Sequence, residues 1–146
     1  MKIARDTWVL VADGEKYLVL RNEGSPAAPD LQVIREAEAE NPPTREQGSD
    51  RPGRMAGPAG RGPSAVQETD WHRLEKERFA KDLAERLRLW ALAGRFETLV
   101  LLADPRTLGV LRPLLHKEVV GRLAAEIPKD LTGMSVPGIE AALKVA

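Results

Sequence analysis

Hydrophobic positions form short, closely spaced runs in the first part of the chain. Thr7 to Ala12 is an almost continuous β-branched and apolar run, and Tyr17 to Leu20 is a second. The Asp13-Gly14 pair between them predicts a hairpin, because glycine accepts the positive φ of a tight turn. A third run, Leu31 to Arg35, follows a loop with proline and glycine. We therefore predict three strands, and the uniformly apolar first strand should be covered on both faces.

The second half of the chain switches between helical and extended spacing. From Asp70 to Gly94, apolar residues recur every three or four positions, which predicts a long helix with Asp70 as N-cap and Gly94 as stop signal. Thr98 to Ala103 and Arg122 to Ile127 are predicted strands. Asp104-Pro105 has the sequence of a helix start, with aspartate as N-cap and proline in the first turn.

Two further proline signals delimit the remaining helices. Pro113 should kink or end the helix that begins at Asp104-Pro105. A terminal helix is predicted from Ser135 to Val145, with Ser135 or Val136-Pro137 at its start. The order of strands and helices predicts the α/β class, with a mixed central β-sheet of about five strands flanked by helices. The whole chain, residues 1–146, is expected to be one domain.

One segment departs from this pattern. Residues 41–65 hold five of the 11 prolines and five of the 12 glycines, with Arg45, Arg51, Arg54 and Arg61 against Glu46 and Asp50. Such a segment buries too little apolar surface to offset an ordering cost of roughly 1–2 kcal/mol per residue. We predict a flexible basic loop at about residues 41–69. It is either a linker without a site or a loop that binds a macromolecule.

The composition excludes several classes of chemistry. Lys and Arg number 22, and Asp and Glu also number 22, so no global field steers the protein onto nucleic acid or an anionic membrane. The chain has no cysteine, which excludes disulfides, thiolate metal sites and cysteine nucleophiles. No cofactor is expected. No run approaches the ~20 apolar residues of a membrane span, and no secretion signal is visible, so a cytoplasmic location is expected.

Few side chains suggest catalysis. The glycines between residues 57 and 62 are not followed by the Lys-Ser/Thr of a Walker A loop. His72 is more simply a surface or capping histidine than a general base, and His116 is expected to lie near a helix end where the helix dipole favours it. Trp8, Trp71 and Trp90 are expected to pack in the core or at its edge. A hydrolase that uses His72 with Asp130 remains a weaker alternative, and Arg73 is a further weak candidate for the site.

Several segments in a fixed order carry a family resemblance. They are Thr7–Gly14, Asp50–Arg54, Asp70–Ala80, Gly94–Phe96 with Leu99–Ala103, Leu108–Arg112 and Glu126–Thr132. Together they resemble the bacterial host attachment protein family, also called proteins required for attachment to host cells. That family is similar in fold to the middle domain of archaeal and eukaryotic class-one peptide release factors, which is ribonuclease H-like in topology. The resemblance thus implies a mixed sheet flanked by helices.

The resemblance also implies a role for the basic loop. In release factors the corresponding loop leads into the long helix and carries Gly-Gly-Gln, which promotes hydrolysis of the peptidyl-tRNA ester. This chain has no Gly-Gly-Gln, so the resemblance does not extend to that activity, and no catalytic residue or metal ligand is assigned.

Two functions from different classes follow. The first is a non-enzymatic ribosome- or tRNA-associated module whose Arg51, Arg54 and Arg61 contact phosphate. The second is a protein-binding adaptor needed for bacterial attachment to host cells or surfaces. The oligomeric state is not predicted.

Overall fold

The centre of the molecule is a five-stranded sheet. The computed structural model describes residues 1–38 and 65–146. The strands are β1 (Trp8–Ala12), β2 (Lys16–Asn22), β3 (Leu31–Glu38), β4 (Leu99–Ala103) and β5 (Leu123–Ile127), in the spatial order β3-β2-β1-β4-β5. β1 pairs antiparallel with β2 and parallel with β4, and β4 pairs parallel with β5. The predicted mixed sheet of about five strands is therefore confirmed.

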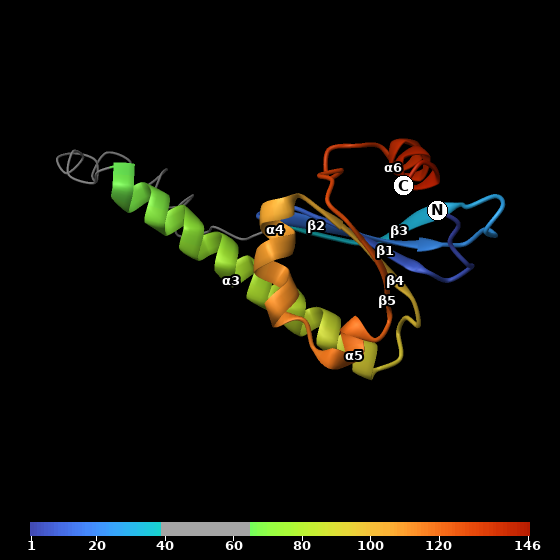
Figure 1. Cartoon of the computed structure of the whole chain (residues 1–146), viewed down its shortest axis with the longest axis horizontal. Helices are drawn as coiled ribbons and strands as arrows, with labels where there is room; N and C mark the ends of the chain where they lie inside the picture. Colours follow the sequence, from blue (N-terminus) through green and yellow to red (C-terminus); the bar gives the residue numbers. More distant parts are fainter. Residues whose placement is uncertain (39–64) are drawn as a thin grey trace.

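Helices cover both faces of this sheet (Figure 1). One face carries α3 (Ala65–Leu92), α4 (Pro105–Leu111), the 3-10 turn η1 (Arg112–Leu114) and α5 (Lys117–Val120). The other face carries α6 (Val136–Lys144). The amino-terminal part of α3 extends beyond the edge of the sheet (Figure 1).

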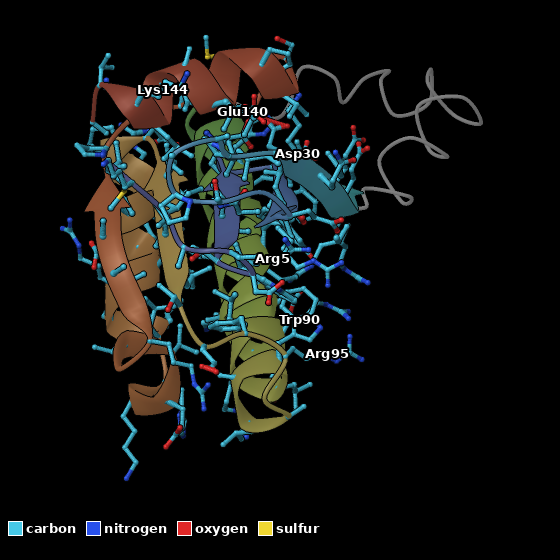
Figure 2. The ribbon with its side chains drawn as sticks, turned by 90° about the vertical axis from the view of Figure 1, so that its right-hand side faces the viewer. Arg5, Asp30, Trp90, Arg95, Glu140 and Lys144 are labelled. Atoms are coloured by element: carbon cyan, nitrogen blue, oxygen red, sulfur yellow. The ribbon has the colours of Figure 1, made fainter. Side chains whose placement is uncertain are left out.

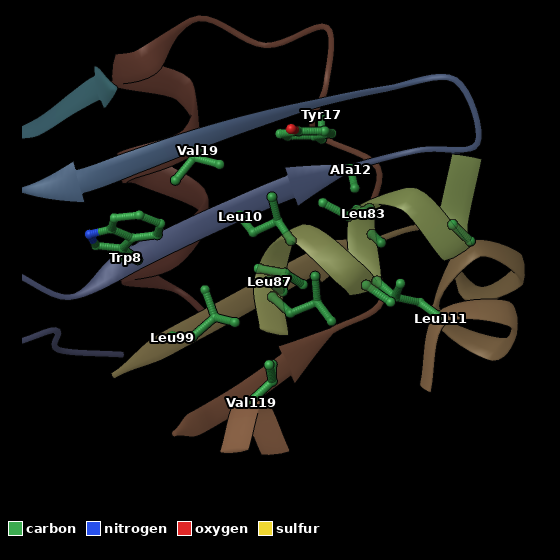
Figure 3. Packing of buried hydrophobic residues seen from close by; sticks show 14 of the residues in the cluster. Trp8, Leu10, Ala12, Tyr17, Val19, Leu83, Leu87, Leu99, Leu111 and Val119 are labelled. Atoms are coloured by element: carbon green, nitrogen blue, oxygen red, sulfur yellow. The ribbon is translucent and has the colours of Figure 1, made fainter. Parts of the chain in front are cut away.

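Strand β1 is the core of the fold. All of its side chains are buried, as its uninterrupted apolar run predicts. Trp8 and Leu10 face α3, whereas Val9 and Val11 face α6, so one strand contributes to two apolar layers. On the α3 side, Leu83 and Leu87 pack against β1 and β4 (Figure 3). Buried leucines of this kind typically stabilise a fold by about 2–5 kcal/mol each relative to alanine.

The long helix begins earlier than the sequence predicted. Asp70 is not its N-cap, because α3 starts at Ala65 and Asp70 lies inside it. The good helix formers that precede Asp70 continue the helix toward the amino terminus. The predicted loop at 41–69 therefore ends at residue 64 or before. The predicted stop is confirmed, because α3 ends at Leu92 and Gly94 adopts a φ of 71°.

The helix that follows β4 has the predicted ends. The Asp104 carboxylate accepts a hydrogen bond from the Thr107 N–H at 3.1 Å, and Pro105 occupies the first turn of α4. At the other end, Pro113 lies in η1, where the α-helix has already given way to a tighter turn. The Ser135 hydroxyl likewise caps α6, as predicted.

Three local predictions are wrong. His116 lies at the start of α5, where its Nδ1 accepts a hydrogen bond from the Glu118 N–H, so it is an N-cap and does not meet the negative end of a helix dipole. Trp71 is 43% exposed and does not pack in the core, because it lies in the amino-terminal part of α3, which extends beyond the edge of the sheet (Figure 1). Gly14 lies in the β1–β2 turn as predicted, but its φ is not positive. Among the described residues, Gly94 is the glycine that has a positive φ.

The other tryptophans pack as expected. Trp8 is buried, and its ring meets those of Trp90 and Phe96 at centroid distances of 5.5 and 5.1 Å. Trp90 lies at the outer border of this layer, near the loop that carries Arg95 (Figure 2). Among the described residues, no helix is both long and apolar enough to cross a bilayer.

Candidate functional site

A hollow of about 530 Å³ lies between α3, α4 and the β1–β2 turn. We call it the α3–α4 pocket. It sits at the carboxyl edge of β1 and β4, because Asp13 follows β1 and α4 follows β4 directly. Neighbouring parallel strands end at the same edge of a sheet, and ligands of α/β proteins commonly bind there.

The floor of the pocket is apolar. It consists of Phe79, Ala80 and Leu83 from α3, together with Val110 and Leu111 from α4. Leu83 and Leu111 are buried and belong to the core layer under α3 (Figure 3). Phe79 is partly exposed, and its ring packs on that of Tyr17 at a centroid distance of 5.9 Å. The floor is therefore the outer surface of the core and does not need a ligand to form.

The rim of the pocket is mainly basic. His72, Arg73 and Lys76 from α3 and Arg106 from α4 line it, and all four side chains are exposed. Asp13 and Glu77 are its acidic members. Basic groups on an apolar floor can bind an anion that also carries an apolar or aromatic part.

The carboxylate of Asp13 is engaged within the protein. Its Oδ1 accepts hydrogen bonds from the N–H groups of Glu15 and Lys16 at 2.7 and 2.8 Å. Its Oδ2 accepts one from the hydroxyl of Thr132 at 3.0 Å. Asp13 thus closes the β1–β2 turn and joins it to the loop after β5, so its acceptor sites are largely used by the protein.

Asp104 lies near the same edge and is held ionised. Burial alone would raise its pKa, but hydrogen bonds from the Thr107 hydroxyl and N–H and the charge of Lys76 outweigh burial. The net effect is a pKa below the usual range for aspartate. The positive charge of Lys76 thus stabilises the ionised form of Asp104, while the Lys76 side chain remains exposed to solvent.

A second hollow of about 310 Å³ lies between α3 and the β2–β3 hairpin. Its charges are balanced, with Arg35, Arg78 and Arg86 against Glu38, Glu75 and Asp82. The guanidinium groups of Arg35 and Arg86 also lie over the Trp90 ring, at 5.6 and 5.9 Å from its centroid. These arginines therefore have structural partners, and this hollow offers less to an anion than the α3–α4 pocket does.

The predicted site residues lie in different parts of the molecule. Arg51, Arg54 and Arg61 lie outside the described residues. His72 and Arg73 line the α3–α4 pocket, whereas Asp130 does not. The Asp130 carboxylate accepts a hydrogen bond from the N–H of Thr132 and shares the Thr132 hydroxyl proton with Asp13.

The weaker hydrolase alternative finds no support in this geometry. No hydrogen bond or ion pair joins His72 to Asp130 in the part of the chain that the structure describes. Within the same part, no three His, Asp or Glu side chains come close enough together to hold a metal ion.

Sequence reasoning missed Lys76 and Arg106. Two signals could have identified them. Arg106 follows the Asp104-Pro105 helix start at a strand end, and Lys76 lies four residues after His72 on the same side of the helix. Neither signal shows that α3 and α4 pack side by side, which is what brings the two cations to one pocket.

Comparison with known families decides the classification. The sequence profile of the bacterial archaeo-eukaryotic release factor family 12 matches residues 6–143. The chain belongs to this family. The match covers all the described residues of the α3–α4 pocket, so the pocket is part of the family domain in this chain.

Comparison with solved structures finds several chains that are similar to this family 12 protein. The archaeal translation termination factor aRF1 is 11% identical in sequence and superimposes with a TM-score of 0.46. The alignment covers 95% of this chain and 39% of the archaeal factor, so this chain corresponds to well under half of that protein. No curated protein matches the sequence.

Proposed function

We propose that this family 12 protein is a non-enzymatic module that associates with the ribosome or with tRNA. Membership in a release-factor family supports the connection with translation. The observation that carries the proposal is the basic rim of the α3–α4 pocket, formed by Arg73, Lys76 and Arg106. The helix that supplies two of these cations directly follows the segment that contains Arg51, Arg54 and Arg61.

Phosphate groups are the expected targets of these arginines. A guanidinium group can donate two parallel hydrogen bonds to one phosphate, which is stronger than a contact between neutral groups. The chain has no net charge, so RNA binding must come from a local concentration of basic groups. The Arg51–Arg61 segment and the pocket rim together would form such a basic region.

Co-sedimentation with bacterial ribosomes over a salt series tests this proposal. We expect binding that weakens as salt rises, because cations bound to phosphate are released and replaced. A variant in which Arg51, Arg54 and Arg61 are all glutamine should bind more weakly. The slope of the logarithm of its binding constant against the logarithm of the salt concentration should be less steep by about two. Deletion of residues 48–62 should have at least the same effect.

The matched control removes three positive charges elsewhere. Arg5, Arg95 and Lys144 are exposed (Figure 2), and none of them lines the α3–α4 pocket. Replacing all three by glutamine changes the net charge equally and should leave ribosome binding nearly unchanged. Binding that does not respond to salt, or that falls equally in both triple variants, would argue against the proposal.

A protein-binding adaptor in attachment to host cells is the second candidate function. Trp71 and Leu74 are 43% and 51% exposed, and both lie in the amino-terminal part of α3. Exposed apolar side chains of this kind favour a protein partner at that part of the helix. If the adaptor is correct, no form of the protein sediments with ribosomes. In that case, a strain with Trp71→Ser and Leu74→Ser should attach less well than the parent strain while the protein level stays constant.

A further inference from the structure

We infer that the α3–α4 pocket binds one nucleoside 5′-phosphate unit, either as a free nucleotide or as a single nucleotide of an RNA. Lys76 and Arg106 would hold the phosphate, and the base would lie on the apolar floor. This inference rests on described residues alone. It does not depend on Arg51, Arg54 or Arg61, so it can hold whether or not the protein binds ribosomes.

The size and lining of the pocket fit such a ligand. Its volume of about 530 Å³ lies within the ~300–1,000 Å³ of typical small-ligand pockets. The floor offers the partly exposed ring of Phe79 beside the aliphatic surface of Val110 and Leu111. An aromatic ring next to aliphatic groups is a surface on which a nucleobase can stack.

The charges of the pocket favour a phosphate at its mouth. Lys76 and Arg106 come from different helices, and neither forms an ion pair or a side-chain hydrogen bond with another described residue, although the charge of Lys76 also acts on Asp104. Glu77 is an exposed carboxylate on the rim, and the other one, Asp13, already accepts hydrogen bonds from Glu15, Lys16 and Thr132. The two cations therefore have donor capacity that the described protein does not use.

Gly14 shapes the binding position of Lys76. A Cβ atom placed on Gly14 would lie 2.9 Å from Cδ and 3.1 Å from Cγ of Lys76, which is too close for carbon atoms. The aliphatic stem of Lys76 thus lies against the β1–β2 turn only because residue 14 has no side chain. This packing limits the conformations of the Lys76 side chain, which lines the pocket, and so lowers the entropy lost when its ammonium group binds a phosphate.

The combination of features distinguishes this ligand from simpler anions. Inorganic phosphate would use the two cations and leave the apolar floor in water. A nucleoside without phosphate would use the floor and leave the cations unpaired. A nucleoside 5′-phosphate satisfies both parts of the pocket, so it should bind more tightly than either fragment.

Titrations followed by NMR of the nitrogen-labelled protein test the inference. The probes are AMP, adenosine, inorganic phosphate and a short single-stranded RNA, each raised to millimolar concentration. We expect AMP, the RNA or both to shift the amide signals of Gly14, Lys76, Thr107 and Val110, and to bind more tightly than adenosine or phosphate. Binding of AMP identifies a free nucleotide as sufficient, and binding of the RNA alone identifies a nucleotide within RNA.

Variants locate the site. Arg106→Ala and Lys76→Ala should each weaken binding about tenfold, as expected for loss of a charged hydrogen bond to phosphate. Val110→Trp should block the floor and abolish base-dependent binding while phosphate still shifts the rim signals. The matched control is Arg95→Ala, which removes an exposed arginine from the segment before β4. This variant should bind AMP and the RNA like the parent.

The results that would overturn the inference are specific. They are the absence of shifts with both AMP and RNA, or shifts that Arg106→Ala, Lys76→Ala and Val110→Trp all leave unchanged in variants with parent-like spectra. Deletion of residues 48–62 should preserve AMP binding. Loss of ribosome binding in that deletion with AMP binding intact would separate this inference from the proposed function.

Discussion

Thr132, in the loop after β5, donates a hydrogen bond of 3.0 Å to the carboxylate of Asp13 at the end of β1. The two residues are 119 positions apart in the chain, and their contact joins the β1–β2 turn to the segment that leads into α6. The Thr132 hydroxyl also lies 2.7 Å from Asp130. One threonine therefore holds two loops of the carboxyl edge together.

Removal of this hydroxyl should loosen the carboxyl edge. Thr132→Val keeps the shape of the side chain, and we expect a loss of about 1 kcal/mol in the free energy of unfolding, as for a typical hydrogen bond. Thr132→Ser retains the hydroxyl and should restore most of the loss. Urea unfolding measures both variants. Equal stability of Thr132→Val and the parent would show that the contact does not stabilise the fold.

The Asp104 cap should make stability depend on acid. Its folded-state pKa is lowered, so the ionised form stabilises the fold above the unfolded-state pKa, and this contribution is lost as the pH falls through the folded-state pKa. Asp104→Ala should cost about 1 kcal/mol at neutral pH, the usual cost of losing an N-cap. The difference between the variant and the parent should shrink as the pH falls below the ordinary pKa of an aspartate and through the lower pKa of Asp104 in the folded state. Urea unfolding at several pH values measures this, and a difference that stays constant with pH would contradict the assignment.

The elements with strong local signals could be predicted from the sequence. The uninterrupted apolar run at Trp8 to Ala12 predicts a strand buried on both faces, and Asp104-Pro105 predicts the start of α4. These signals depend only on neighbouring residues. Where two local signals compete, the prediction fails, as at Asp70, whose capping propensity is overridden by the helix formers before it.

The candidate site could be predicted only in part. His72 was identified because it follows the unusual basic segment in the sequence, and Arg73 was a weak candidate next to it. Lys76 and Arg106 were missed because their proximity depends on how α3 packs on α4, a relationship between residues 30 positions apart that no local pattern encodes. The four hydrogen bonds of Asn22 were also missed, for the same reason.

Asn22 should be one of the most sensitive polar positions. It is completely buried, and its amide nitrogen donates to the carbonyl groups of Ile3 and Ala4, while its oxygen accepts from the N–H groups of Gly24 and Asp30. Asn22→Asp removes both donors and places a carboxylate against two carbonyl oxygens. We expect a loss of about 3 kcal/mol or more, as for a buried polar group left without partners.

Thermal and urea unfolding of Asn22→Asp, compared with Gln32→Glu, measure this effect. Gln32 is exposed and forms one side-chain hydrogen bond, to Asp30, so the same change from amide to acid should cost less than about 1 kcal/mol there. Similar losses in the two variants would show that the Asn22 network contributes little to the stability of the fold.

Gly14→Ala should affect ligand binding more than stability. The added methyl group meets the stem of Lys76, which is flexible and exposed and can move aside, so the free energy of unfolding should fall by less than about 1 kcal/mol. Moving the stem also moves the ammonium group that would hold the phosphate, and AMP affinity should fall nearly as much as in Lys76→Ala. Because both changes act through Lys76, the double variant should bind no more weakly than Lys76→Ala alone. Losses that add in the double variant would show that Gly14 acts on the ligand by another route, such as direct contact with it.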